Sequence, residues 1–239
     1  LLSEAAGRDG VSVGLAPHSI RAVPGGWLEA IAAFADERDL PVHIHASEQP
    51  GELAESREEY GTTPIAAFDE LGLLSDRLTI IHATHATDAE IDRMAERGAA
   101  VCACPTTERN LGDGFLPARK LFEAGVPVCI GTDSHANIDP WEEMRLIEYH
   151  ERLRTQRRNV LAGGLDADNR GRLETARALW PTGGARGARA LGLPPARLEP
   201  GDPADFVAID LQNPAMAGSD TESLPSDLVF SCQNGAVAD

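Results

Sequence analysis

Short apolar runs alternate with helix-like segments from residue 11 to residue 135, and this alternation is the feature that most limits how the chain can fold. Each run is almost continuously hydrophobic, which is typical of a strand buried on both faces of a parallel sheet. The expected strands are Val11–Ala16, Pro41–Ala46, Leu78–Ala83, Ala99–Cys104 and Val126–Thr132. Strands that alternate with helices predict an α/β fold, either an open doubly wound sheet or a (β/α)8 barrel.

Helical spacing of apolar residues fills the intervals between these strands and the region after them. The expected helices are Trp27–Arg38, Pro64–Leu71, Asp88–Arg97, Pro117–Ala124, a long helix Trp141–Leu161 and an interrupted helix Thr175–Leu193. Gly98 and Gly125 directly follow two of these helices and suit the left-handed position that ends a helix. No G-x-G-x-x-G pattern follows any expected strand, so a dinucleotide-binding sheet has no support in the sequence.

The composition excludes several kinds of partner. A net charge of −17 argues against binding to nucleic acid and to anionic membrane surfaces. The sequence contains no run of 18 apolar residues, so no transmembrane helix is predicted. Cys102 and Cys104 do not form a zinc-binding C-x-x-C pair, and their apolar setting favours core packing over metal binding. A reducing cytoplasm fits these features best, and a homodimer is one option for the assembly.

Six of the seven histidines lie at the carboxyl ends of the expected strands, which is where parallel α/β folds bind ligands. A single histidine at such an end is usually a satisfied, partly buried imidazole. Several histidines that converge with a carboxylate form the donor set that Zn²⁺ or Fe²⁺ takes. Such a metal lowers the pKa of a bound water toward neutrality, and a nearby glutamate can then move protons. The strand ends therefore predict a catalytic metal site.

Three of these strand ends resemble the amidohydrolase superfamily, specifically its mononuclear deaminase branch. The matching motifs are His45-x-x-Glu48, His82 and Gly-Thr-Asp133-Ser. The resemblance implies a (β/α)8 barrel of which the five expected strands are the fourth to the eighth. It also implies a metal held by an H-x-H of the first barrel strand, a histidine of the fifth and an aspartate of the eighth.

Carried over residue by residue, the resemblance implies a role for each of these side chains. His45 and Asp133 are expected to bind the metal, which we expect to be Zn²⁺, with Fe²⁺ as the alternative. Glu48 is expected to transfer protons. His82 is expected to contact the attacking water or the developing tetrahedral centre.

Two longer segments resemble the formimidoylglutamate deiminase family within this superfamily. They are the loop Thr106–Gly114 and the long helix that follows Trp141, and the similarity extends over about Val11–Leu211. This family hydrolyses N-formimino-L-glutamate to N-formyl-L-glutamate and ammonia in histidine degradation. His18 and Arg21 match a motif that faces the substrate there, and an Arg guanidinium suits the carboxylates of a small acidic substrate.

The chain also departs from the superfamily pattern. No H-x-H lies upstream of His18, and five βα units cannot close an eight-stranded barrel. The sequence therefore predicts a partial barrel over residues 1–195. The C-terminal part of a small β-sandwich is expected over residues 196–239, with Gly201–Asp210 as its return strand. The chain is expected to be truncated at both ends.

Two alternatives stay open at this point. One keeps the deaminase chemistry and changes the substrate to an aminopurine, an S-adenosyl nucleoside or a chlorotriazine. The other is a catalytically inactive fragment or scaffold, because two of the four expected metal ligands are missing from the sequence.

Overall fold

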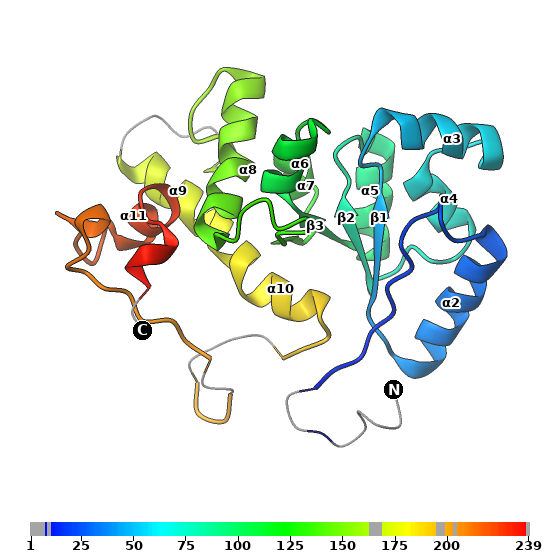
Figure 1. The fold of residues 1–239 in the computed structure, drawn as a ribbon, viewed down its shortest axis with the longest axis horizontal. Helices are drawn as coiled ribbons and strands as arrows, with labels where there is room; N and C mark the ends of the chain where they lie inside the picture. Colours follow the sequence, from blue (N-terminus) through cyan, green and yellow to red (C-terminus); the bar gives the residue numbers. More distant parts are fainter. Residues whose placement is uncertain (1–7, 9–10, 163–168, 195–198, 203–204, 238–239) are drawn as a thin grey trace.

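A four-stranded parallel sheet forms the centre of the computed structural model (Figure 1). Its strands are β1 Val42–Ala46, β2 Leu78–His82, β3 Ala100–Ala103 and β4 Val128–Ile130. The structure describes residues 8, 11–162, 169–194, 199–202 and 205–237. The spatial order β1-β2-β3-β4 follows the order along the chain, and helices connect each strand to the next. This is the repeated βα arrangement that the alternating sequence pattern predicts.

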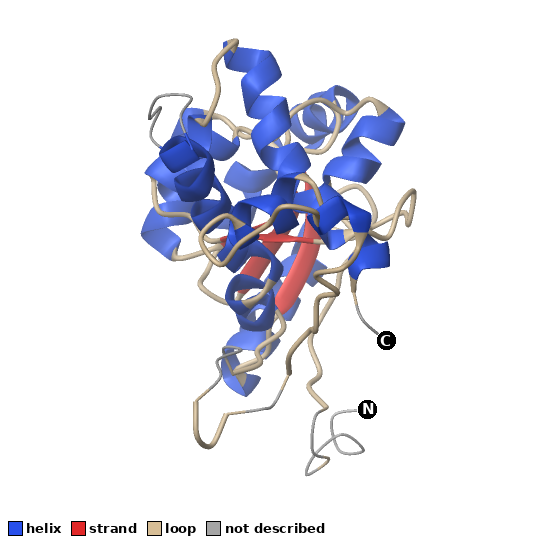
Figure 2. Cartoon of the chain, turned by 90° about the vertical axis from the view of Figure 1, so that its left-hand side faces the viewer, coloured by secondary structure: helices blue, strands red, loops and turns tan. Residues whose placement is uncertain are grey.

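The helices surround the strands, as Figure 2 shows. They are α2 Gly25–Arg38, α3 Pro50–Tyr60, α4 Pro64–Glu70, α5 Asp88–Arg97, α6 Pro105–Leu111, α7 Ala118–Glu123, α8 Pro140–Thr155, α9 Asn169–Leu179, α10 Ala185–Ala190 and α11 Leu224–Phe230. Short 3₁₀ turns are η1 Val160–Ala162, η2 Trp180–Gly183, η3 Pro214–Met216 and η4 Asn234–Ala236. Among the described residues, no helix has both the length and the apolar character needed to cross a membrane.

The first expected strand, Val11–Ala16, is not a continuous strand. Leu15 and Ser19 each form an isolated parallel bridge to β1, so this segment does run beside β1 in the predicted direction. Pro17 lies between the two bridges and has no N–H group to donate, which interrupts the ladder at that point.

The long helix α8 is shorter than its sequence pattern predicts. It begins after Asp139, whose side chain accepts hydrogen bonds from the first backbone N–H groups of the helix. It ends at Thr155, before the expected end at Leu161, and the next residue, Gln156, adopts a left-handed conformation with a φ of 56°. The buried carboxylate of Glu148 then accepts the N–H groups of Val160 and Leu161, so these residues fold back against α8.

Side-chain alternation in β1 separates the core from the site. Ile44 is fully buried between the sheet and the helices, whereas His43 and His45 point to the opposite face and are partly exposed. This alternation follows from the two-residue period of a strand. His43 Nε2 lies 2.7 Å from the backbone oxygen of Ala190 at the end of α10, so only His45 of this pair belongs to the site described below.

Residues 205–237 contain helical turns and one antiparallel bridge. The expected return strand Gly201–Asp210 contributes a single bridge, Ile209 to Val237, rather than a continuous strand, and residues 203–204 of it lie outside the described residues. The helix α11 in this region contacts α8 and α9. The predicted division into residues 1–195 and 196–239 stays a prediction.

Candidate metal centre

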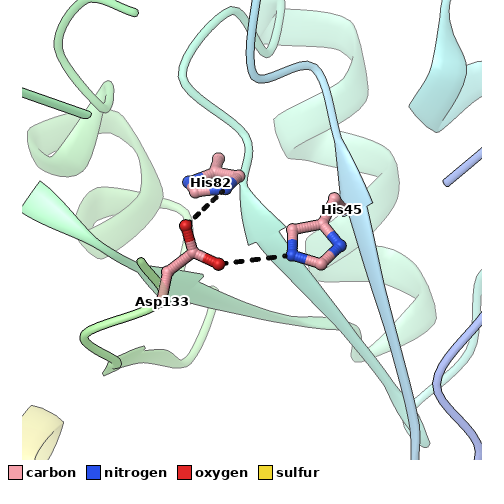
Figure 3. A group of neighbouring side chains, drawn as sticks. All are labelled: His45, His82 and Asp133. Atoms are coloured by element: carbon pink, nitrogen blue, oxygen red, sulfur yellow. Dashed lines mark ion pairs between the residues drawn. The ribbon is translucent and has the colours of Figure 1, made fainter. Parts of the chain in front are cut away.

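Three side chains from three strand ends converge at one point (Figure 3). His45 lies in β1, His82 ends β2, and Asp133 follows β4. His45 Nε2 is 3.5 Å from Asp133 Oδ1, and His82 Nε2 is 4.0 Å from Asp133 Oδ2. One donor atom from each residue lies within 4.8 Å of the others. Two imidazoles and a carboxylate at this spacing suit a divalent transition metal.

The backbone is strained at two of these residues. His82 has a φ of 76° and Asp133 a φ of 45°, in the left-handed region that non-glycine residues seldom adopt. Each such residue costs on the order of 1–3 kcal/mol and persists only where its surroundings hold it in place. Backbone strain of this kind concentrates at functional sites, so it supports the assignment of this cluster as the site.

His82 is the buried member of the group, with 1% of its side chain exposed. Its Nδ1 lies 3.4 Å from Glu108 Oε1, an arrangement that favours a proton on Nδ1. Its Nε2 points toward Glu48 Oε1 at 3.6 Å and has no hydrogen-bond partner. A buried polar atom without a partner costs about 1–3 kcal/mol, so this nitrogen indicates a position for a ligand.

The surroundings of His82 and Glu48 shift both pKa values upward. Burial raises the pKa of Glu48; the charge of His82 opposes this rise, and the carboxylates of Asp113 and Asp133 add to it. Burial lowers the pKa of His82, but the hydrogen bond with Glu108 and the charge of Glu48 outweigh burial, so this pKa lies above its ordinary value. A raised pKa makes Glu48 better suited than an ordinary glutamate to hold a proton and pass it on.

His18 and Arg21, the predicted substrate-binding residues, occupy different positions relative to this group. The ring of His18 stacks on His45 with centroids 4.9 Å apart, and its backbone oxygen lies 2.8 Å from His45 Nδ1. That contact leaves His45 Nε2 free for a metal, as partners behind metal-binding histidines commonly do. Arg21 instead pairs with Glu55 at 3.9 Å, and within the described residues no ion pair or hydrogen bond joins it to the metal cluster.

Two acidic residues near the site have no role in the sequence interpretation. Glu108, fully buried, contacts His82 as described above. Asp113 accepts a hydrogen bond from Gln49 at 2.9 Å, and its backbone oxygen lies 2.8 Å from His85 Nε2. Their place in the Thr106–Gly114 loop is a signal that could have indicated a role near the site, because that loop directly follows a strand end.

Cys102 and Cys104 are free thiols and contribute no donor to the metal cluster. A Cβ at Gly131 would lie 3.0 Å from Cys102 Sγ and 3.5 Å from Cys104 Sγ. These thiols therefore pack closely against the chain that leads to Asp133.

Known proteins show the same family and fold. The amidohydrolase family model matches residues 2–239. Formimidoylglutamate deiminase of Pseudomonas aeruginosa is 37% identical over 236 residues, which cover 99% of this chain and 50% of that protein. A 5-methylthioadenosine/S-adenosylhomocysteine deaminase of Haloarcula marismortui is 33% identical over 224 residues, or 92% of this chain and 48% of that protein. The chain thus spans about half the length of the curated relatives it matches.

Solved structures extend this comparison to the fold. The crystal structure of an adenosine deaminase from Xanthomonas campestris with bound zinc is 32% identical, with a TM-score of 0.85 over 98% of this chain and 51% of that one. An atrazine chlorohydrolase from Arthrobacter aurescens, complexed with zinc, is 24% identical and shares the fold with a TM-score of 0.82 over 99% of this chain and 51% of that one. These matches confirm the predicted α/β fold, a partial (β/α)8 barrel. The chain belongs to the amidohydrolase family.

Proposed function

We propose that the protein carrying this chain is a metal-dependent deaminase that hydrolyses N-formimino-L-glutamate to N-formyl-L-glutamate and ammonia. The observation that carries the proposal is the convergence of His45, His82 and Asp133, with Glu48 at 3.6 Å from His82. The 37% identity to a formimidoylglutamate deiminase supports the substrate. The proposal concerns the full-length protein, because the chain spans about half of that relative.

We place one divalent metal, Zn²⁺ or Fe²⁺, at His45 and Asp133. The donor chemistry fits, because His45 Nδ1 contacts the His18 carbonyl and its Nε2 faces Asp133. The unpartnered Nε2 of His82, beside the same carboxylate, also fits a ligand at this point. Zinc is favoured because a structural relative at 32% identity contains it. When bound, the metal lowers the pKa of a water molecule toward neutrality and so supplies a nucleophile.

The side chains of this chain then move the protons. The Asp133 carboxylate accepts the proton of the attacking water. Glu48, whose pKa is raised by burial, delivers a proton to the leaving nitrogen. His82, whose raised pKa favours a second ring proton, donates from Nε2 to the negative charge that develops at the tetrahedral centre.

The open side of the site holds the substrate carboxylates in this proposal. Arg21 has 36% of its side chain exposed, and its contact with Glu55 at 3.9 Å is longer than a hydrogen bond. Its guanidinium can therefore turn to a carboxylate in the bidentate geometry that Arg favours. His18 lies against His45, with ring centroids 4.9 Å apart.

A purine nucleoside is the second candidate substrate. Its support is the 33% identity to a 5-methylthioadenosine/S-adenosylhomocysteine deaminase and the structural match to an adenosine deaminase. The scarcity of aromatic residues at the strand ends argues for the acidic substrate, because a purine site needs stacking partners.

Ammonia release by the full-length protein separates these candidates. Formiminoglutamate should be hydrolysed with a higher kcat/KM than S-adenosylhomocysteine, 5′-deoxyadenosine or guanine. Asp133→Ala should remove both bound metal and turnover, because it deletes a proposed ligand. Preference for a nucleoside would overturn the substrate, and full activity of Asp133→Ala would overturn the metal site.

A further inference from the structure

The first turn of α6 is buried in full although it borders the site. Thr106, Thr107 and Glu108 each have 0% of their surface exposed. They belong to the loop by which the sequence resembles formiminoglutamate-specific enzymes. Side chains without exposed surface cannot touch a substrate, so their effect on the reaction has to pass through the residues they contact.

Thr107 contacts both neighbours of Asp133. Its hydroxyl lies 3.0 Å from the backbone oxygen of Thr132 and 2.9 Å from Ser134 Oγ, and it accepts the backbone N–H of Ser134 at 3.1 Å. Asp133 itself has a φ of 45°. A strained residue keeps its conformation only where its surroundings over-determine it, and this hydroxyl supplies contacts on each side.

Glu108 contacts the other half of the cluster. Its Oε1 accepts the backbone N–H of Cys104 at 3.0 Å and faces His82 Nδ1 at 3.4 Å. The carboxylate is an acceptor only, so it requires the proton on Nδ1. Nε2 of His82 then points into the site with its lone pair or its second proton available.

Thr106 fixes this turn to the long helix. Its backbone N–H donates to Glu143 Oε2 at 3.0 Å, and its hydroxyl donates to Glu143 Oε1. Glu143 lies on α8 and is 1% exposed. The turn is therefore tied to a helix outside the site and does not move as a free loop.

We propose that Thr107 and Glu108 are positioning residues, which set the orientation of Asp133 and His82 for the metal-dependent reaction. The inference rests on the proposed function in one respect, namely that Asp133 binds a metal. Loss of a partner behind a metal ligand typically weakens metal affinity about 10–100-fold. Loss of the Thr107 hydroxyl should have an effect of that size.

Zinc affinity of the full-length protein tests the role of Thr107. Affinity is measured by competition with a chelator for wild type, Thr107→Val and Thr107→Ser, with near-UV circular dichroism as the check on folding. Val matches Thr in shape and lacks the hydroxyl, whereas Ser keeps it. Thr107→Val should bind Zn²⁺ about 10–100-fold more weakly, and Thr107→Ser should bind it like wild type. Equal affinity of Thr107→Val and wild type, or equal weakening in both variants, overturns the proposal.

The protonation of the His82 ring gives a second measurement. It is made on the protein with Thr107 unchanged, so it does not depend on the folding of a Thr107 variant. Nitrogen-15 shifts of labelled histidines at alkaline pH report which ring nitrogen carries the proton, and His82→Gln identifies the signal. Protonated Nδ1 supports the role of Glu108, and protonated Nε2 overturns it. Ammonia release from formiminoglutamate tests the proposed function separately. If the protein binds zinc but releases no ammonia, the proposed function fails, and the zinc affinities of the Thr107 variants still decide this inference.

Discussion

The two halves of the candidate site differ in how the chain holds them. On one side, His82 is 1% exposed and Glu108 is fully buried, and hydrogen bonds from α6 fix them. On the other side, His45 has 27% and Arg21 36% of the side chain exposed, and His45 is held by a stacked ring and one backbone carbonyl. Fixed, desolvated groups suit proton transfer, and accessible groups suit the exchange of ligands. Substitutions in the buried half should therefore lower kcat or metal affinity, and substitution of Arg21 in the open half should raise KM.

Glu48→Gln in the buried half should have the largest effect. The amide cannot carry a proton to the leaving nitrogen, so kcat should fall by about 10²–10⁴-fold. Bound zinc should be unchanged, because Glu48 is not a proposed ligand. Steady-state ammonia release and metal analysis measure the two quantities. Glu58→Gln, on the exposed face of helix α3 that follows Glu48, is the matched control and should behave like wild type. Metal loss in Glu48→Gln would contradict the separation of roles.

Glu143→Gln, behind the buried half, should change the pH dependence of stability. Burial raises the pKa of Glu143 to about 7, against 4.5 for the free group, although hydrogen bonds from Thr106 oppose the rise. Between these values the native state binds more protons than the unfolded state, so wild-type stability falls as pH rises. Glu143→Gln cannot lose stability in this way. Its free energy of unfolding, measured relative to wild type, should therefore increase by about 3 kcal/mol as the pH rises from 4.5 to 7.

Urea unfolding of both proteins at a series of pH values measures this difference. His150 on the same helix provides a control of opposite sign, because burial lowers its pKa to about 4 from 6.5. Wild-type stability gains from His150 as pH rises, so His150→Gln should lose stability relative to wild type over that range. A difference curve for Glu143→Gln that does not change between pH 4.5 and 7 would contradict the raised pKa of Glu143.

The sequence predicts the polar residues at the strand ends better than it predicts the contacts that hold them in place. His45, Glu48 and His82 follow from local patterns, since strand alternation and the H-x-x-E spacing place them at adjacent strand ends. The contacts of Thr107 with Ser134 join residues 27 positions apart, and no local pattern specifies such a pair. The pairing of Arg21 with Glu55 likewise joins two separate segments of the chain, and no local pattern specifies it.

The limits of the fold prediction have similar causes. The short helix α6 has seven residues and opens with a proline, so its hydrophobic period is too short to identify. The end of α8 depends on Glu148, whose carboxylate captures backbone N–H groups 12 and 13 residues later. The alternation of strands and helices was predictable because each element has its own apolar period in the sequence. The position of α6 and the end of α8 depend instead on contacts between elements.

Arg21 tests the open half. Arg21→Ala removes the proposed carboxylate partner, and a charge-assisted hydrogen bond of about 1.5–3 kcal/mol corresponds to a rise in KM for formiminoglutamate of about 10–100-fold. The kcat should stay near wild type, because the residue does not contact the metal cluster. Arg21→Lys should recover part of the affinity, since Lys keeps the charge but lacks the bidentate geometry. A fall in kcat with unchanged KM would move Arg21 into the catalytic half and break the comparison.

Thr87→Ala has the smallest expected effect. It tests whether metal binding depends on the hydrogen bonds around Asp133 or only on the overall stability of the protein. Thr87 forms a reciprocal cap with Glu90 at the start of α5, and its loss should cost about 1 kcal/mol of stability. Thermal unfolding should shift by a few degrees, while zinc affinity and kcat stay at wild-type values. Thr87→Ser, which keeps the cap, is the control. If Thr87→Ala weakens zinc binding as much as Thr107→Val does, general stability rather than the hydrogen bonds around Asp133 controls the metal site, and the contrast between the two halves fails.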